Sequence, residues 1–199
     1  MPPNVTVVPA NEASWEDLQT VLSARGPAAR CQCQRYKLRR RESFGSFPVE
    51  ERAHRLRQQT DCGHPGSAST SGLVGYLDGE PAGWCAVERR TAYEGLVRNN
   101  RVPWTGREQD KADPGVWAVT CVLVRVGHRR CGLGQVLVRA AVDFARERGA
   151  GALEGYPITT SDVIAEGLHV GTPAMFAAAG FTEVARPTPR RVVMRIELG

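Results

Sequence analysis

The pattern of hydrophobic and polar residues predicts a buried strand followed closely by an amphipathic helix. Residues 116–124 (VWAVTCVLV) are apolar at nearly every position, which is typical of a central strand covered on both faces. After a short segment that contains two glycines, apolar residues recur every three or four positions from Leu133 to Ala145. Gly149 then ends the predicted helix.

Two shorter apolar segments upstream of this strand predict a β-hairpin. Residues 72–77 (GLVGYL) and 81–88 (PAGWCAVE) are joined through Asp78 and Gly79, a pair that favours a tight turn between antiparallel strands. The residues that follow, 90–114, are polar and rich in turn formers, and we expect a long loop there.

The N-terminal part predicts one short strand and two helices. Residues 5–8 are β-prone, and Ser14 followed by Asp17 is a variant of the capping box that predicts a helix starting near Trp15. An irregular stretch then leads to Pro48, which suits the first turn of a second helix.

The C-terminal part predicts three further strands and one helix. The strands are residues 152–158, 181–185 and 191–198, and the helix is residues 172–180, with Thr172 as its cap. The whole order is β, α, α, β, β, β, α, β, α, β, β. This order indicates one α/β domain over residues 1–199, in which helices cover the faces of a mixed sheet.

Composition narrows the possible function classes. The chain has 199 residues, of which 42% are hydrophobic and 24% charged, as in ordinary soluble proteins. No apolar run reaches bilayer length and the N-terminus lacks signal-peptide features, so we expect a cytoplasmic protein without a membrane partner. A net charge of +5 suits an anionic ligand. The arginines are scattered and form no known nucleic-acid motif, so we expect no nucleic-acid partner.

The segment between the buried strand and its helix has the chemistry of an anion site. Its residues are Arg129, Arg130, Cys131, Gly132, Leu133 and Gly134. The first amide hydrogens of a helix have no partner within the helix, and its dipole makes that end electropositive. Glycines let phosphate oxygens approach the backbone, and arginines add charge-assisted hydrogen bonds. We therefore predict a diphosphate site here.

Three diphosphate-binding patterns compete for this segment. A P-loop requires a Lys-Ser or Lys-Thr pair that is absent here, and a dinucleotide fingerprint requires a third glycine where this chain has Leu137. The remaining pattern, [Q/R]-x-x-G-x-[G/A] after an apolar strand, fits at every fixed position. In this respect the sequence resembles the GNAT superfamily of N-acetyltransferases. The predicted elements over residues 70–198 also follow that family's order, whereas residues 25–65 and 90–114 match less clearly.

The resemblance implies a GNAT-type acyl-CoA-binding fold, with a mostly antiparallel central sheet flanked by helices. It implies that acetyl-CoA is the co-substrate, with its diphosphate on the amides from Arg129 to Gly134. Its pantetheine arm would lie along the backbone of Val122, Leu123 and Val124, where the central strands splay apart. The implied reaction is direct attack of a primary amine on the thioester in a ternary complex. Its partners are thus an acyl-CoA and an amine-bearing acceptor.

Candidate catalytic residues follow from the need to remove a proton from the attacking amine. Under the family layout, Glu88 and Glu154 lie near the acceptor side, and each is either the base or an ion-paired carboxylate. Tyr156 is either the acid for the leaving thiolate or a core residue. The family often places a tyrosine at the position of Phe176, which cannot donate a proton. His169 is either a contact to the acceptor or a solvated side chain.

The cysteines allow one further site. Cys31, Cys33, Cys62 and His64 could in principle form a zinc site, but neither spacing is usual for one, so we expect reduced thiols and no metal.

Two functional alternatives remain open at this level. Because Phe176 replaces the usual acid, the fold could serve as a non-catalytic acyl-CoA-binding regulatory module. A nucleotide-binding enzyme is the less favoured alternative.

Overall fold

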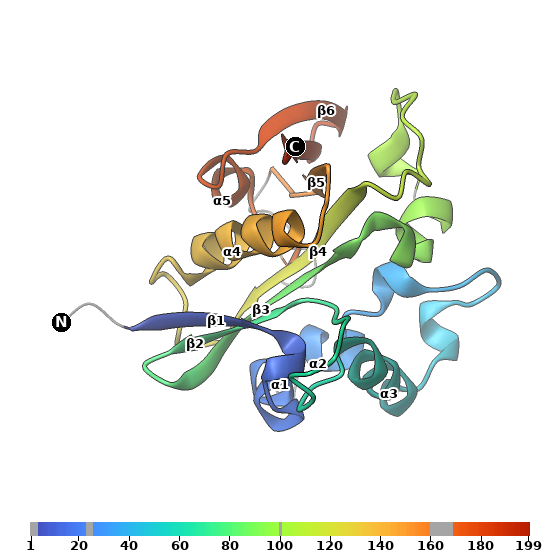
Figure 1. Cartoon of the computed structure of the whole chain (residues 1–199). Coiled ribbons are helices and arrows are strands. Elements are labelled where there is room, and N and C mark those ends of the chain that lie inside the picture. Colours follow the sequence, from blue (N-terminus) through green and yellow to red (C-terminus); the bar gives the residue numbers. More distant parts are fainter. Residues whose placement is uncertain (1–3, 23–25, 100, 160–168) are drawn as a thin grey trace.

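The computed structural model describes residues 4–22, 26–99, 101–159 and 169–199. Seven strands form one twisted sheet in the order β1-β2-β3-β4-β5-β7-β6 (Figure 1). Among the described strands, β4 and β5 are the one parallel pair, and the other neighbouring pairs are antiparallel. The strands are β1 (Val5–Pro9), β2 (Leu73–Leu77), β3 (Glu80–Arg89), β4 (Val116–Val124), β5 (Ala152–Gly155), β6 (Thr182–Thr188) and β7 (Arg191–Glu197). This is the mixed, mostly antiparallel sheet that the sequence predicts.

Helices cover both faces of the sheet. One face carries the first three helices and the other face carries α4 and α5 (Figure 1). The helices are α1 (Trp15–Leu22), α2 (Pro27–Cys31), α3 (Val49–Thr60), α4 (Leu133–Glu147) and α5 (Pro173–Ala177). Among the helices in the described ranges, none has the length and apolar character needed to span a bilayer.

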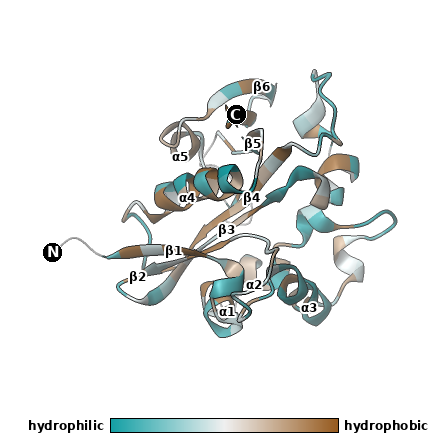
Figure 2. Cartoon of the chain, viewed as in Figure 1, coloured by the Kyte–Doolittle hydropathy of each residue, from teal (hydrophilic) through white to brown (hydrophobic). Residues whose placement is uncertain are grey.

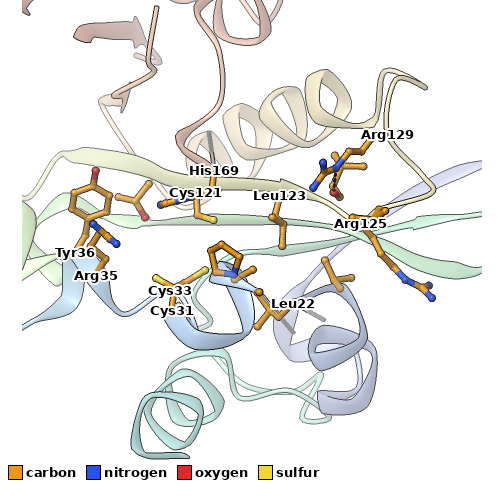
Figure 3. Close-up of a pocket in the computed structure, with 17 residues that line it drawn as sticks. Leu22, Cys31, Cys33, Arg35, Tyr36, Cys121, Leu123, Arg125, Arg129 and His169 are labelled. Atoms are coloured by element: carbon orange, nitrogen blue, oxygen red, sulfur yellow. Dashed lines mark hydrogen bonds between the residues drawn. The ribbon is translucent and has the colours of Figure 1, made fainter. Parts of the chain in front are cut away.

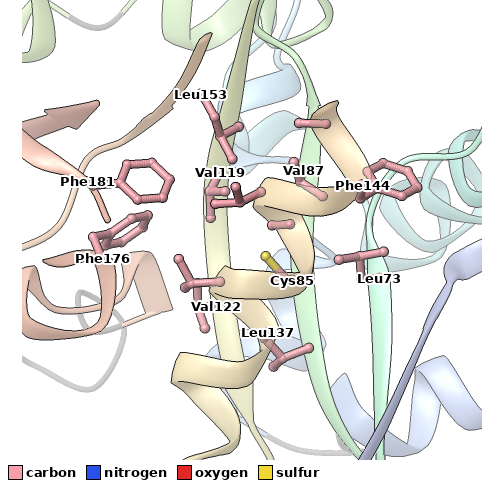
Figure 4. Close-up of a cluster of buried hydrophobic side chains, with 14 of the residues drawn as sticks. Leu73, Cys85, Val87, Val119, Val122, Leu137, Phe144, Leu153, Phe176 and Phe181 are labelled. Carbon is pink, nitrogen blue, oxygen red and sulfur yellow. The ribbon is translucent and has the colours of Figure 1, made fainter. Parts of the chain in front are cut away.

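The larger core lies between α4 and the sheet. Figure 2 shows apolar residues concentrated on the sheet and on the side of α4 that faces it. Leu137 and Phe144 from α4 pack there against β3 and β4 (Figure 4). Phe144 meets Trp117 of β4 edge-on, with 6.0 Å between ring centroids. Burying large apolar side chains of this kind contributes about 1.5–3 kcal/mol each, so α4 and β4 hold each other in place.

The strongest local patterns in the sequence are confirmed. β4 is buried from Val116 to Val122, and Asp78 and Gly79 both take the left-handed backbone of a type I′ turn between β2 and β3. The Ser14 hydroxyl accepts the Asp17 amide at 3.0 Å and caps α1. Some elements differ from prediction. The short helix α2 was not predicted, β5 ends at Gly155 instead of residue 158, and β6 continues through residue 188 because its edge position tolerates proline.

The parallel pair β4 and β5 separates partway along β4. β5 pairs with β4 only as far as Gly155, which faces Val119. Beyond that point, Ala86 of β3 faces Cys121 while Val87 faces Val119, so Thr120 is the extra residue of a β-bulge. Among the described residues, the edge of β4 after Val119 therefore has no strand partner on the β5 side.

Candidate functional site

The loop between β4 and α4 is exposed to solvent before the helix begins. Residues 129–132 are exposed, whereas Leu133 and Gly134 begin α4 and are buried. Arg130 and Gly132 take left-handed backbone conformations, with φ of 65° and 83°. Gly132 is the N-terminal capping position of α4, and its carbonyl accepts the amides of Gln135 and Val136.

The amides of this loop are available to a ligand. Within the described ranges, none of the six amide hydrogens from Arg129 to Gly134 is donated to another protein group. They lie at the electropositive end of a 15-residue helix, and two arginines stand beside them. An anion with several acceptor oxygens fits this chemistry, and a diphosphate is one.

The two glycines of the loop have different surroundings. A Cβ on Gly132 would meet no atom within 4 Å, so this position opens to solvent. A Cβ on Gly134 would come 2.9 Å from Cε of Met175 in α5, so this glycine allows α4 and α5 to approach closely. Gly132 therefore borders the space that an anion would occupy, and Gly134 serves packing as well.

A pocket of about 300 Å³ extends from this loop along β4 (Figure 3). Arg129 and Arg125 stand at one end, where Nε of Arg129 donates to the Val124 carbonyl at 3.2 Å. Arg35 and Tyr36 stand at the other end. The remaining lining comes from α1, from α2 and its flanking residues, from β4 and the loop after it, and from His169. These residues are Val21, Leu22, Gly26, Pro27, Ala28, Cys31, Cys33, Thr120, Cys121, Leu123, Val124, Val126 and His169.

Glu154 on β5 does not border this pocket. Its carboxylate is fully buried and bonded to three guanidinium groups, with Arg107 at 2.5 Å and Arg90 and Arg195 at 3.2 Å. Burial alone would raise the pKa of Glu154, but these cations outweigh it and hold the pKa below its ordinary value. A carboxylate held in this way is a poor proton acceptor. The arrangement therefore gives no support to the prediction that Glu154 is the base.

Tyr156 and Glu88 also lie away from the pocket lining. The Tyr156 hydroxyl is buried and donates to Glu154 at 2.9 Å; burial and that carboxylate raise the pKa of Tyr156 well above its usual range. Glu88 forms an ion pair with Lys37 and borders a separate cavity next to Trp117. The structure brings Tyr156 and Glu154 together, and it brings neither of them nor Glu88 to the loop after β4.

Phe176 fills the core at the place where β4 and β5 part. Its ring is fully buried and meets Phe181 edge-on, with 5.1 Å between centroids (Figure 4). A Cβ on Gly155 would lie only 2.2 Å from this ring, so Phe176 occupies the volume beside the end of β5. The position that often carries a tyrosine in the family thus has a packing role here.

The four side chains considered as zinc ligands have different neighbours. The Cys62 thiol donates to the Thr60 hydroxyl at 3.3 Å, and the exposed His64 contacts Asp61 at 2.9 Å. Cys31 and Cys33 line the pocket instead. In the part of the chain that the structure describes, no three metal-ligating side chains converge.

Comparison with known families shows which family the chain belongs to. The family model of the acetyltransferase (GNAT) family matches residues 34–169, about two thirds of the chain. The chain belongs to the GNAT acetyltransferase family. The matched region contains β4, the exposed loop and α4, and it also includes the residues 90–114 that resemble the family less clearly by pattern.

Individual relatives of this GNAT protein are similar in fold or in part of the sequence. The yncA protein of Salmonella typhimurium, solved with its cofactor acetyl-CoA, has a TM-score of 0.55 at 15% identity and covers 98% of this chain and 94% of its own. An N-acetyltransferase of Staphylococcus aureus has a TM-score of 0.55 at 12% identity, covering 98% and 99%. A streptothricin acetyltransferase of Streptomyces lavendulae is 46% identical over 57 residues, 29% of each chain.

One wall of the pocket is not evident from the sequence pattern. That wall comes from α2 and from the turn that follows it, and it includes Cys31, Cys33, Arg35 and Tyr36. A weak signal was present, because Pro27 occupies the first turn of α2, a position that proline favours. A helix of five residues is too short to show an apolar period, so the pattern could not reveal which face it buries.

Proposed function

We propose that this GNAT-family protein is an acyl-CoA-dependent N-acetyltransferase that transfers acetyl from acetyl-CoA to a primary amine in a ternary complex. The six available amides from Arg129 to Gly134 carry the proposal, because they are donors suited to a diphosphate and Arg129 stands at one end of the pocket. When bound there, acetyl-CoA supplies the reactive thioester. The free edge of β4 after Val119 offers main-chain groups to the pantetheine arm, and the pocket beyond it receives the amine.

We infer that His169 accepts the amine proton in place of the predicted carboxylates. Its half-buried side chain lines the pocket near Cys121 (Figure 3), and imidazole is the side chain whose ordinary pKa lies nearest neutrality. His169→Gln should lower kcat/KM by about 100-fold at neutral pH, the usual loss on removing a general base, and should leave CoA affinity unchanged. Steady-state rates and CoA titration measure both effects.

The matched control for this prediction is Glu88→Gln. Glu88 is one of the two base candidates from the sequence, and its carboxylate borders the separate cavity next to Trp117. If Glu88→Gln loses the rate and His169→Gln keeps it, the proton acceptor is Glu88 and the assignment to His169 is wrong.

The lining of the pocket supports a proposal about the amine. Its described lining contains no aspartate or glutamate, its walls are mostly apolar, and the Arg35 guanidinium stands at the end away from Arg129. Within the described ranges Arg35 forms no ion pair; it lies over the Phe44 ring at 5.3 Å. We infer that the preferred acceptor carries a carboxylate that pairs with Arg35 and a small apolar body.

Matched amines test this preference. Leucine should react with a kcat/KM at least about 10-fold above that of isopentylamine, which lacks only the carboxylate, because a hydrogen bond to a charged group contributes about 1.5–3 kcal/mol. Arg35→Gln should remove the difference, whereas Arg39→Gln, at an exposed arginine outside the lining, should keep it. Streptothricin belongs in the panel because the Streptomyces lavendulae relative is named for it. A faster rate on streptothricin than on every carboxylated amine would contradict the role of Arg35.

The second candidate function is a non-catalytic acyl-CoA-binding module, which Phe176 favours because it leaves no hydroxyl at that position. One measurement distinguishes the enzyme from the binding module. Free CoA thiol should appear when an amine panel is added to the protein with acetyl-CoA. CoA binding without thiol release on any amine would favour the module.

A further inference from the structure

Two cysteines from different elements meet in the pocket. Cys33 follows α2 and Cys121 belongs to β4, and both side chains line the pocket between these elements (Figure 3). The two side chains pack in the same apolar cluster on this face of the sheet. In the sequence, α3, β2, β3 and the long loop after β3 lie between the two residues, so only the fold brings them together.

The surroundings of Cys33 favour its thiolate. The Trp84 indole N–H donates to the Cys33 sulfur at 3.0 Å. The neighbouring Cys121 thiol, together with the Trp84 hydrogen bond and the charge of Lys37, outweighs burial and lowers the pKa of Cys33. The proximity of Cys33 and burial raise the pKa of Cys121. One thiol is thus prepared to attack and the other remains protonated beside it.

We propose that Cys33 is an oxidant-reactive site and that it forms a disulfide with Cys121 which closes the pocket to the amine. The Cys33 thiolate attacks one oxygen of hydrogen peroxide, which breaks the O–O bond and gives a sulfenic acid and hydroxide. The Cys121 sulfur then attacks the sulfenic sulfur and its hydroxyl leaves as water. In total, two thiols lose two electrons, and one peroxide is reduced to two waters.

The bond would lie across the space that the amine needs. Cys33 comes from one wall of the pocket and Cys121 from the other, next to the bulge at Thr120. A covalent link between them holds α2 against β4 in the middle of the lining. The diphosphate loop lies at the Arg129 end and is not part of this link. The loss of amine acetylation rests on the proposed function, whereas formation of the disulfide does not.

The disulfide can be mapped directly. The reduced full-length protein is treated with hydrogen peroxide, remaining thiols are alkylated, and tryptic peptides are identified by mass spectrometry. Trypsin places Cys31 and Cys33 in peptide 31–35 and places Cys121 alone in peptide 112–125. The Cys31→Ser variant should still give the linked pair of peptides, whereas Cys33→Ser, which keeps Cys31, should not. A link through Cys31, or no link after the exposed Cys131 is fully oxidised, would overturn the proposal.

Activity gives the second measurement. Peroxide should reduce amine acetylation by the wild-type protein in proportion to the linked peptide, and dithiothreitol should restore it. The ratio of rates after and before treatment should stay near one in Cys121→Ser and should fall in Cys62→Ser, whose thiol lies outside the pocket. Equal inactivation of Cys121→Ser would show that the disulfide is not the cause. If no amine reacts at all, peptide mapping still decides whether the thiols pair, so the two failures are distinguishable.

Discussion

Gly132→Asp should weaken CoA binding by at least about 100-fold while the protein remains folded. A carboxylate at this position faces the space beside the six amides, and two like charges 4 Å apart near a protein surface repel by about 4 kcal/mol. The backbone there is left-handed, a conformation that Asp and Asn tolerate better than other side chains. Titration of the purified variant with CoA measures the loss, and circular dichroism measures the fold.

Gly132→Asn is the matched control, because it has the same shape and backbone demand without the charge. It should lose much less affinity than Gly132→Asp. Equal affinity for CoA in wild type and Gly132→Asp would place the diphosphate elsewhere and remove the basis of the proposed function. Gly134 is a less suitable position for this test, since its Cβ would press on Met175 and disturb packing.

Glu154→Gln should destabilise the protein by about 3 kcal/mol, the lower range for removing one partner of a buried ion pair. The variant leaves Arg90, which is fully buried, and the largely buried Arg107 and Arg195 without their common anion. For a domain of this size, the melting temperature should fall by about 6–12 °C. Thermal unfolding measures the shift.

The control for Glu154→Gln is the same substitution at Glu183, whose ion pair with Arg186 is exposed. It should change stability by less than about 1 kcal/mol. An unchanged melting temperature in Glu154→Gln together with a large loss of rate would restore Glu154 as a catalytic candidate.

The contribution of Glu154 should also depend on pH. Because the pKa of Glu154 is lowered in the folded state, its contribution is fully present above its ordinary value of 4.5 and is lost as the pH falls through the lowered pKa. The stability difference between wild type and Glu154→Gln should therefore be constant near neutral pH and shrink below about pH 4.5. Urea unfolding at several pH values measures it.

The fold was largely predictable because its main signals are local. A few consecutive residues are enough to predict the apolar strand β4, the helical period of α4 and the Asp78-Gly79 turn. The short helix α2 was missed because five residues carry no readable period. The diphosphate prediction depended on local chemistry as well, and the available amides of residues 129–134 support it.

The roles of the carboxylates and thiols were not predictable in this way. Glu154 is a plausible base in sequence, yet its three arginine partners come from three segments that only the fold assembles: Arg90, Arg107 and Arg195. Cys33 lies near Cys121 for the same reason, although in the sequence its spacing to Cys31 suggests only a possible metal site.

The sequence by itself determined the order of the elements, the buried central strand and the glycine-containing loop after it, since backbone periodicity and glycine placement act over a few residues. Tertiary structure alone decided which acidic groups are neutralised by arginines, which residues line the pocket and which thiols meet. Those outcomes depend on burial and on contacts between segments far apart in the chain, and such contacts set the charge and reactivity of a side chain more than its neighbours in sequence do.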